Sequence, residues 1–140
     1  QIAWVWKEPF ERDIAPVYER NTEIYELFWE AITRNGLQEQ VSAFKGTSSL
    51  FAGTPAGRSF RCKLAFIDGD HGYEAVCQDI RNVDSFLVEG GWICLDDAFS
   101  HYEGINRAIE ELVLDNPDYE LGQQMTRKFF IARKKRHIGR

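Results

Sequence analysis

Two short apolar runs constrain the fold of this chain most strongly, because each ends in aspartate and a helical pattern lies between them. The runs are CKLAFID at residues 62–68 and WICLDD at residues 92–97. Between them, residues 73–86 carry apolar side chains at helical spacing. A strand, a helix and a second strand in this order form a right-handed crossover, with the two strands parallel in one sheet.

Similar patterns flank this central unit. We expect further strands at 2–6, 40–46, 119–125 and 128–134, helices at 22–35 and 104–114, a loop at 47–61 and a turn at 89–91. This alternation predicts an α/β fold with a mostly parallel sheet, helices on both faces and a C-terminal antiparallel pair. We expect one domain over residues 1–135 and a basic tail at 136–140.

Composition excludes several classes of partner. No apolar run approaches the ~20 residues of a membrane helix, and the first residues lack the basic head and apolar core of a signal peptide. Seven of the 17 Lys and Arg residues fall in residues 127–140, which leaves ten basic against 22 acidic residues in 1–126. Such an acidic body disfavours nucleic acid. We therefore predict a cytoplasmic protein with neither nucleic-acid nor membrane partners.

The three cysteines predict no cross-link. Cys62, Cys77 and Cys94 are spaced unlike any common zinc motif, and an odd number argues against a disulfide framework. Each lies in an apolar pattern, so we expect buried thiols in a reducing compartment.

The ends of the two apolar runs are candidates for a metal site. Ligands of open α/β sheets bind beyond the carboxyl ends of the strands, where Asp68, Asp96 and Asp97 would meet. Converging carboxylates repel unless a cation neutralises them, and oxygen ligands suit Mg²⁺. His71 follows closely enough to act as a general base near neutral pH. Taken singly, each of these residues is more often a turn, cap or surface residue, and Asp70 is assigned as a turn former.

Two segments carry a resemblance to a known family. FIDGDHGYEAVCQDI, followed by LVEGGWICLDDAF, resembles the class I S-adenosylmethionine-dependent methyltransferases. The branch that is most similar contains metal-dependent sugar O-methyltransferases and cephalosporin-hydroxylase-type proteins; catechol and caffeoyl-coenzyme A O-methyltransferases are more distant. The resemblance implies a Rossmann-like sheet, S-adenosylmethionine as cofactor, Mg²⁺ or another divalent cation on Asp68, Asp96 and Asp97, and His71 as the base.

The resemblance also implies cofactor contacts. An acidic residue after the family's second strand holds the ribose, which points to Glu8, with Asp13 a weaker match. The segment after the third strand contacts the adenine, which points to Ser48, and Asp68 would border the cofactor as well. The aromatic residues Trp92 and Phe99 are expected either to wall this pocket or to belong to the core.

One part of the family pattern is absent from the chain. The family's first strand and its glycine-rich cofactor loop would precede residues 2–6, and no Gly-x-Gly occurs anywhere in the sequence. We expect either an N-terminally truncated domain, or a rearranged sheet, or a strand supplied by another subunit.

These observations predict a Mg²⁺-dependent O-methyltransferase that uses S-adenosylmethionine to methylate a small hydroxylated acceptor, such as a sugar or a catechol. The alternative is an inactive methyltransferase-fold fragment that serves as an oligomerisation or interaction module through exposed sheet edges, for example as a homo-oligomer. A metal-dependent hydrolase is disfavoured, because a single histidine, His71, falls at the ligand edge.

Overall fold

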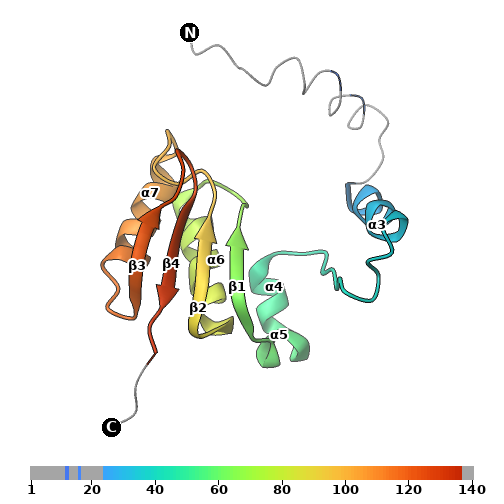
Figure 1. Cartoon of the computed structure of the whole chain (residues 1–140), viewed down its shortest axis with the longest axis horizontal. Coiled ribbons are helices and arrows are strands. Elements are labelled where there is room, and N and C mark those ends of the chain that lie inside the picture. The colour runs from blue at the N-terminus through green and yellow to red at the C-terminus, as the bar shows by residue number, and fades with distance from the viewer. Residues whose placement is uncertain (1–11, 13–15, 17–23, 137–140) are drawn as a thin grey trace. The chain divides into compact units, whose positions relative to one another are not determined.

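The computed structural model describes Arg12, Pro16 and residues 24–136 (Figure 1). The chain divides into two compact units, Gln1–Lys45 and Gly46–Arg140, which are described separately. The predicted strand at 2–6 and the candidate cofactor residues Glu8 and Asp13 lie outside the described residues.

In the first unit, the described residues form helix α3 (Ile24–Arg34). Its apolar residues recur at helical spacing, as the sequence predicted. The helix ends where Gly36 adopts a left-handed φ of 65°, a conformation that glycine reaches without steric cost. The N–H of Leu37 then donates to the carbonyl of Ile32 at 3.0 Å and closes the helix end.

The strand predicted at residues 40–46 is wrong. The structure has turns and irregular backbone there. The alternation of apolar and polar residues suits a strand, but a strand also needs a neighbour for its backbone hydrogen bonds. The described part of this unit, residues 24–45, offers no second strand.

The second unit is a four-stranded α/β domain (Figure 1). Its elements are α4 (Ser48–Gly53), α5 (Pro55–Ser59), β1 (Cys62–Ile67), α6 (Tyr73–Phe86), β2 (Leu87–Leu95), α7 (Glu103–Ile109), the π-helical turn η2 (Glu110–Leu114), β3 (Tyr119–Gln124) and β4 (Phe130–Lys134). The strand order is β1-β2-β4-β3. β1 and β2 are parallel, and β4 runs antiparallel to both β2 and β3. The predicted Rossmann-like α/β class and the C-terminal antiparallel pair are confirmed.

The core lies between this sheet and helices α6 and α7, which cover the same face of it (Figure 1). Helix α6 has the predicted bounds and directs one apolar side to the strands. The most buried core residues include Val76, Ile80, Ile93, Leu95, Ile105, Ile109, Phe130 and Ala132. None of the described helices is long and apolar enough to cross a membrane.

The turn predicted at residues 89–91 lies inside β2. The strand begins at Leu87 and continues to Leu95. Cys62 pairs with Leu87, but Leu64 pairs with Trp92, so the register shifts between these two pairs. Gly90 takes a left-handed φ of 76° at this point. The glycines therefore form an irregularity in the strand, as glycine in a strand commonly does.

The loop predicted at 47–61 contains two short helices. The side chain of Thr47 accepts a hydrogen bond from the N–H of Leu50 and caps α4. Thr54 caps α5 in the same way, with Pro55 at the first helical position. The sequence signals are local and strong, but the helices are too short to show a clear apolar period.

All three cysteines are free thiols, as predicted. Cys77 and Cys94 are buried, and Cys62 is half-buried. Burial raises the pKa of the Cys62 and Cys94 thiols above their usual range.

Candidate functional site

The ends of β1 and β2 lie side by side and bring two predicted residues to one edge of the sheet. Ile67 pairs with Leu95 in the parallel ladder. The next residues are Asp68 and Asp96, and the N–H of Asp96 donates to the carbonyl of Ile67 at 3.1 Å. This edge is the carboxyl end of the parallel pair, where the ligands of such sheets bind.

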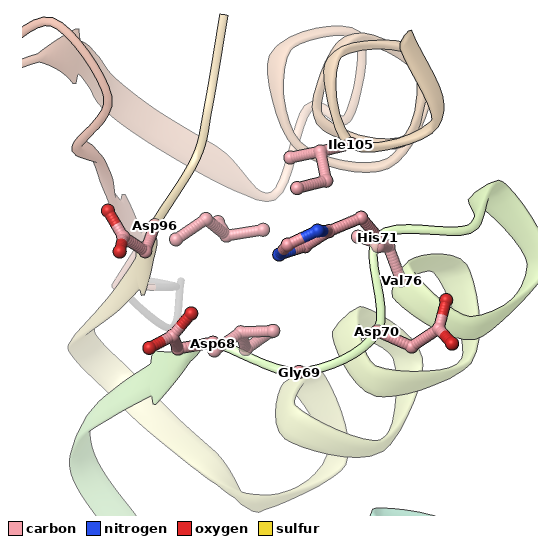
Figure 2. A pocket seen from close by; sticks show the side chains of 9 residues that line it. Asp68, Gly69, Asp70, His71, Val76, Asp96 and Ile105 are labelled. Atoms are coloured by element: carbon pink, nitrogen blue, oxygen red, sulfur yellow. The ribbon is translucent and has the colours of Figure 1, made fainter. Parts of the chain in front are cut away.

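His71 is carried by a tight turn between β1 and α6. The carboxylate of Asp70 accepts a hydrogen bond from the N–H of Gly72 at 2.6 Å, which confirms Asp70 as a turn former. Figure 2 shows the Asp70 carboxylate directed away from the His71 imidazole, which points into a small pocket lined also by Ile105.

Helix α7 supports this turn from the other side. A Cβ on Gly104 would lie 2.6 Å from the carbonyl oxygen of His71 and 2.7 Å from the nitrogen of Tyr73. Only a glycine permits this close approach of the two backbones. Gly104 therefore fixes the position of the residues that carry the imidazole.

A second contact between α6 and α7 begins at the first residue of α6. The Tyr73 hydroxyl donates to Glu111, and the Arg107 guanidinium lies 4.0 Å from the centre of the Tyr73 ring. Arg107 also donates to Glu111 at 2.8 Å. The hydrogen bond to Glu111 raises the pKa of Tyr73 to about 12. Tyr73 was given no role from the sequence, and its place in this network identifies it as a positioning residue.

Three of the predicted site residues converge. Ligand atoms of Asp68, His71 and Asp97 all lie within 4.8 Å of one another. The Nε2 atom of His71 is 3.3 Å from Oδ2 of Asp97. Asp97 is only 9% exposed, whereas Asp68 faces water. Two carboxylates and an imidazole form a donor set that a divalent cation can use.

The backbone at Asp97 is held in an unusual conformation. Asp97 has a φ of 52° and Phe99 a φ of 53°, both in the left-handed region. Aspartate tolerates this region better than most residues, while for a phenylalanine it costs about 1–3 kcal/mol. Strain of this kind persists where surrounding contacts hold the chain, and it directs the Asp97 carboxylate inward beside His71.

A lysine that the sequence did not indicate completes the cluster. The ammonium of Lys128, from the turn between β3 and β4, contacts Oδ1 of Asp97. This oxygen is inaccessible to water and receives no further hydrogen bond among the described residues. The contact raises the pKa of Lys128, so its ammonium stays charged. The sole sequence signal was that Lys128 belongs to a basic C-terminal segment.

Asp96, the third predicted cation ligand, is oriented differently. It is not among the described residues that converge with Asp68 and His71. It lines the small pocket beside them, and Figure 2 shows its carboxylate turned away from the imidazole. The backbone turns at Asp97, whose φ of 52° is left-handed, so the two adjacent aspartates do not direct their side chains to one point.

Two cavities lie on the other side of the β1–α6 turn, where the cofactor was predicted. The larger has a volume of about 440 Å³ and is lined by Gly46, Thr47, Ser48, Ser49, Gly69, Asp70, Ala75, Gln78 and Asp79. A cavity of about 250 Å³ is lined by both Ser48 and Asp68. The larger volume falls in the ~300–1,000 Å³ range of small-molecule sites.

Ser48 lines both cavities but uses its hydroxyl within the protein. It donates to Asp79, and the amide of Asn82 donates to it at 2.9 Å. The same amide also donates to Ser49 at 3.0 Å. These bonds fasten the start of α4 to α6, so Ser48 shapes the cavity wall. Asp79 and Asn82 were not predicted from the sequence, because a single polar residue in a helix is usually a solvent-facing one.

Neither of the two aromatic candidates is among the residues that line these two cavities. The Arg133 guanidinium is 5.9 Å from the Trp92 ring, and the Phe99 ring packs against Phe130 at 5.8 Å. A different aromatic residue is placed at the site: the Tyr102 ring lies 4.0 Å from the His71 ring and 4.0 Å from the His101 ring.

Comparison with known proteins identifies the family. A model of the methyltransferase-domain family matches residues 8–98, well over half of the chain. The chain belongs to this methyltransferase-domain family. Membership implies the use of S-adenosylmethionine as methyl donor. No curated protein matches the chain.

The predicted catalytic, cation-binding and cofactor-binding residues of this methyltransferase domain, from Glu8 to Asp97, fall inside the matched segment, and the aromatic candidate Phe99 lies just beyond it. Lys128 falls outside it. The family match thus includes the converging Asp68, His71 and Asp97, and the lysine that neutralises Asp97 comes from the C-terminal antiparallel pair.

Proposed function

We propose that this methyltransferase domain transfers a methyl group from S-adenosylmethionine to a hydroxyl oxygen of a small acceptor with adjacent hydroxyls, such as a sugar or a catechol. The observation that supports this most is the convergence of Asp68, His71 and Asp97 within 4.8 Å at one sheet edge. Asp68 also lines the cavity of about 250 Å³ beside this cluster. One residue therefore borders both the converging carboxylates and a cavity on the side predicted for the cofactor.

The carboxylates of Asp68 and Asp97 would hold a divalent cation, preferably Mg²⁺, with Asp96 as the remaining predicted ligand. The nearly buried Oδ1 of Asp97, with no partner among the described residues other than the Lys128 ammonium, fits such a role. When bound, the cation supplies Lewis acidity, which lowers the pKa of a neighbouring acceptor hydroxyl.

His71 is proposed as the general base. Because Nε2 faces the Asp97 carboxylate at 3.3 Å, the neutral ring would carry its proton there, and Nδ1 would take the proton of the acceptor hydroxyl. Asp97 would then stabilise the resulting imidazolium. The acceptor oxygen forms the new O–CH₃ bond as the S–CH₃ bond breaks, and the electron pair of that bond returns to sulfur. The Tyr102 ring, 4.0 Å from the imidazole and tilted against it by 38°, limits the rotation of the imidazole.

The cofactor would occupy the larger cavity, with its adenosine between residues 46–49 and the first turns of α6. Gly46 and Gly69 leave room at its opposite walls, and Gln78 offers an amide for hydrogen bonding. The predicted contact of Glu8 with the ribose concerns a residue outside the described part of the chain and stays a prediction.

Isothermal titration calorimetry with S-adenosylmethionine, with and without Mg²⁺, tests cofactor binding in this cavity. Ala75 lines the cavity, so the change Ala75→Leu should fill it and weaken binding at least tenfold. Ala56→Leu is the matched control, because Ala56 is exposed on α5 and should leave binding unchanged. Absence of binding by the unaltered protein in both conditions would remove the cofactor from the proposal.

A second candidate function is a non-catalytic interaction module. It is favoured by the uncovered apolar side of β1, where Leu64 is 62% and Phe66 54% exposed. Light scattering after size-exclusion chromatography distinguishes this case. Self-association that Phe66→Lys abolishes, together with absent S-adenosylmethionine binding, would favour the module over the enzyme.

A further inference from the structure

Asp97 divides its carboxylate between a base and a fixed cation. Oδ2 faces Nε2 of His71 at 3.3 Å, and Oδ1 contacts the ammonium of Lys128. Since Asp97 is almost completely buried, each oxygen needs a partner in the protein or a bound ion. The Lys128 ammonium thus neutralises one oxygen of the carboxylate that the proposed cation would also use.

The main chain of Lys128 is fastened to the segment that carries Asp97. The N–H of Ala98 donates to the carbonyl of Lys128 at 2.8 Å. The turn itself is closed by the N–H of Met125, which donates to the carbonyl of Phe129 at 2.7 Å. The hydroxyl of Thr126 accepts from the N–H of Phe129 at 3.2 Å. These bonds fix the base of the lysine side chain next to Asp97.

The lysine side chain itself is largely open to water. It is 57% exposed, whereas the Asp97 side chain that it contacts is 12% exposed. A long side chain with a fixed base and an exposed end can move its ammonium into water without disturbing the backbone. Moving the ammonium away from Asp97 therefore costs little more free energy than the loss of the ion pair itself.

We propose that Lys128 is a built-in competitor of the divalent cation: its ammonium neutralises Asp97 until the cation displaces it. This inference rests on the proposed cation site. An ammonium and a divalent cation on the same carboxylate would repel each other strongly at a separation of a few ångströms. Lys128 thus keeps the Asp97 carboxylate in place before the cation arrives and lowers the affinity of the site for that cation.

Titration with Mn²⁺, followed by electron paramagnetic resonance and repeated with Mg²⁺ by calorimetry, tests the inference. Lys128→Met removes the competing charge and should tighten Mn²⁺ binding about fivefold, the effect of one ion pair of this exposure. Lys128→Gln should also tighten Mn²⁺ binding. Lys128→Arg keeps the charge and should stay within about twofold of the unaltered protein.

Arg127→Met is the matched control, because it removes a positive charge from the same turn. Among the described residues, the ion pairs of Asp97 are with His71 and Lys128. The Arg127 change should therefore alter Mn²⁺ affinity less than twofold. An equal effect of both methionine variants would show that Mn²⁺ affinity depends on the net charge of the turn, and it would overturn the specific role of Lys128.

The remaining outcomes separate the inference from the proposed function. Equal or weaker Mn²⁺ binding by Lys128→Met and Lys128→Gln, with a measurable affinity in the unaltered protein, overturns the inference alone. Absence of Mn²⁺ binding in every variant overturns the cation site together with the inference. Tighter binding confined to the two variants that lose the Lys128 charge supports both.

Discussion

Asp97 connects three segments of the chain through one side chain. It contacts His71 from the β1–α6 turn and Lys128 from the β3–β4 turn, and it lies within 4.8 Å of Asp68 at the end of β1. Its left-handed backbone restricts the residue types that fit this position. At the scale of residues, the site therefore depends on one aspartate whose backbone and side chain are both constrained.

The first prediction concerns the general base. His71→Ala should lower methyl transfer about 10²–10⁴-fold, because proton removal from the acceptor is lost. Binding of S-adenosylmethionine should change less than twofold, since the imidazole does not line the larger cavity. His101→Ala is the control: its ring is exposed and lies 4.0 Å from the Tyr102 ring, so transfer should be nearly unchanged. Equal losses in both variants would contradict the assignment.

The residues of the site were predictable to different degrees. Asp68, Asp97 and His71 were expected to meet, because strand ends and the start of a helix fix their positions locally. Asp96 was expected with them, but the left-handed backbone at Asp97 directs the two adjacent carboxylates differently. Lys128 was not predictable, because it reaches Asp97 through the register of β4 on β2, which pairs Phe130 with Leu95.

At the scale of elements, the packing of α7 on the β1–α6 turn positions the imidazole. Gly104 at the start of α7 touches the backbone of residues 71–73 closely enough to exclude any side chain. Tyr102, whose ring lies 4.0 Å from the imidazole, directly precedes this helix. A change in α7 should therefore be transmitted to His71 without altering any group that touches the substrate.

Gly104→Ala tests this packing. The added methyl should destabilise the protein by about 1–3 kcal/mol, as overpacking commonly does, and should also lower methyl transfer. Urea unfolding and the transfer rate measure the two effects. Gly53→Ala is the control, since its Cβ would meet nothing within 4 Å. If Gly104→Ala matched the control in both measurements, the close contact would have no structural role.

The C-terminal antiparallel pair is linked to α6 by a buried phenol. The Tyr119 hydroxyl donates to Asp84 at 2.9 Å, and the ammonium of Lys134 lies 3.1 Å from the same carboxylate. Burial and the bond to Asp84 raise the pKa of Tyr119 above its usual value. The folded protein therefore keeps this phenol protonated to higher pH than the unfolded chain does.

This difference predicts a pH dependence of stability. The contribution of Tyr119 is fully present below the unfolded pKa of ~10 and is lost as the pH rises toward the higher folded pKa. The free energy of unfolding should fall above about pH 10. Tyr119→Phe should remove much of that fall while lowering stability at pH 7. Urea unfolding between pH 7 and 11 measures both, and equal slopes in the two proteins would contradict the account.

Elements were predicted well where one signal dominated. The bounds of α6 were exact, because a long amphipathic period lies between two clear breaks. The turn at 89–91 was wrong because glycines also occur at strand irregularities. The strand at 40–46 was wrong because pairing depends on a neighbour that the local pattern does not reveal.

At the scale of the whole molecule, the basic C-terminal segment forms ion pairs with acidic residues within the α/β unit. Seven basic residues fall in residues 127–140, and several of them pair with acids of the preceding chain. Lys128 contacts Asp97, Arg133 contacts Glu120 at 2.6 Å, and Lys134 contacts Asp84 at 3.1 Å. The Lys128 and Lys134 pairs attach the C-terminal strands to the parallel unit that carries the site.

The most direct test of the account is transfer of a labelled methyl group from S-adenosylmethionine to catechol or to a sugar with adjacent hydroxyls. The assay compares Mg²⁺ with a chelator, and the unaltered protein with Asp97→Asn. The account predicts a labelled methyl ether that forms with Mg²⁺, falls at least a hundredfold with the chelator, and falls comparably in the variant. Transfer at equal rates in all of these conditions would contradict it.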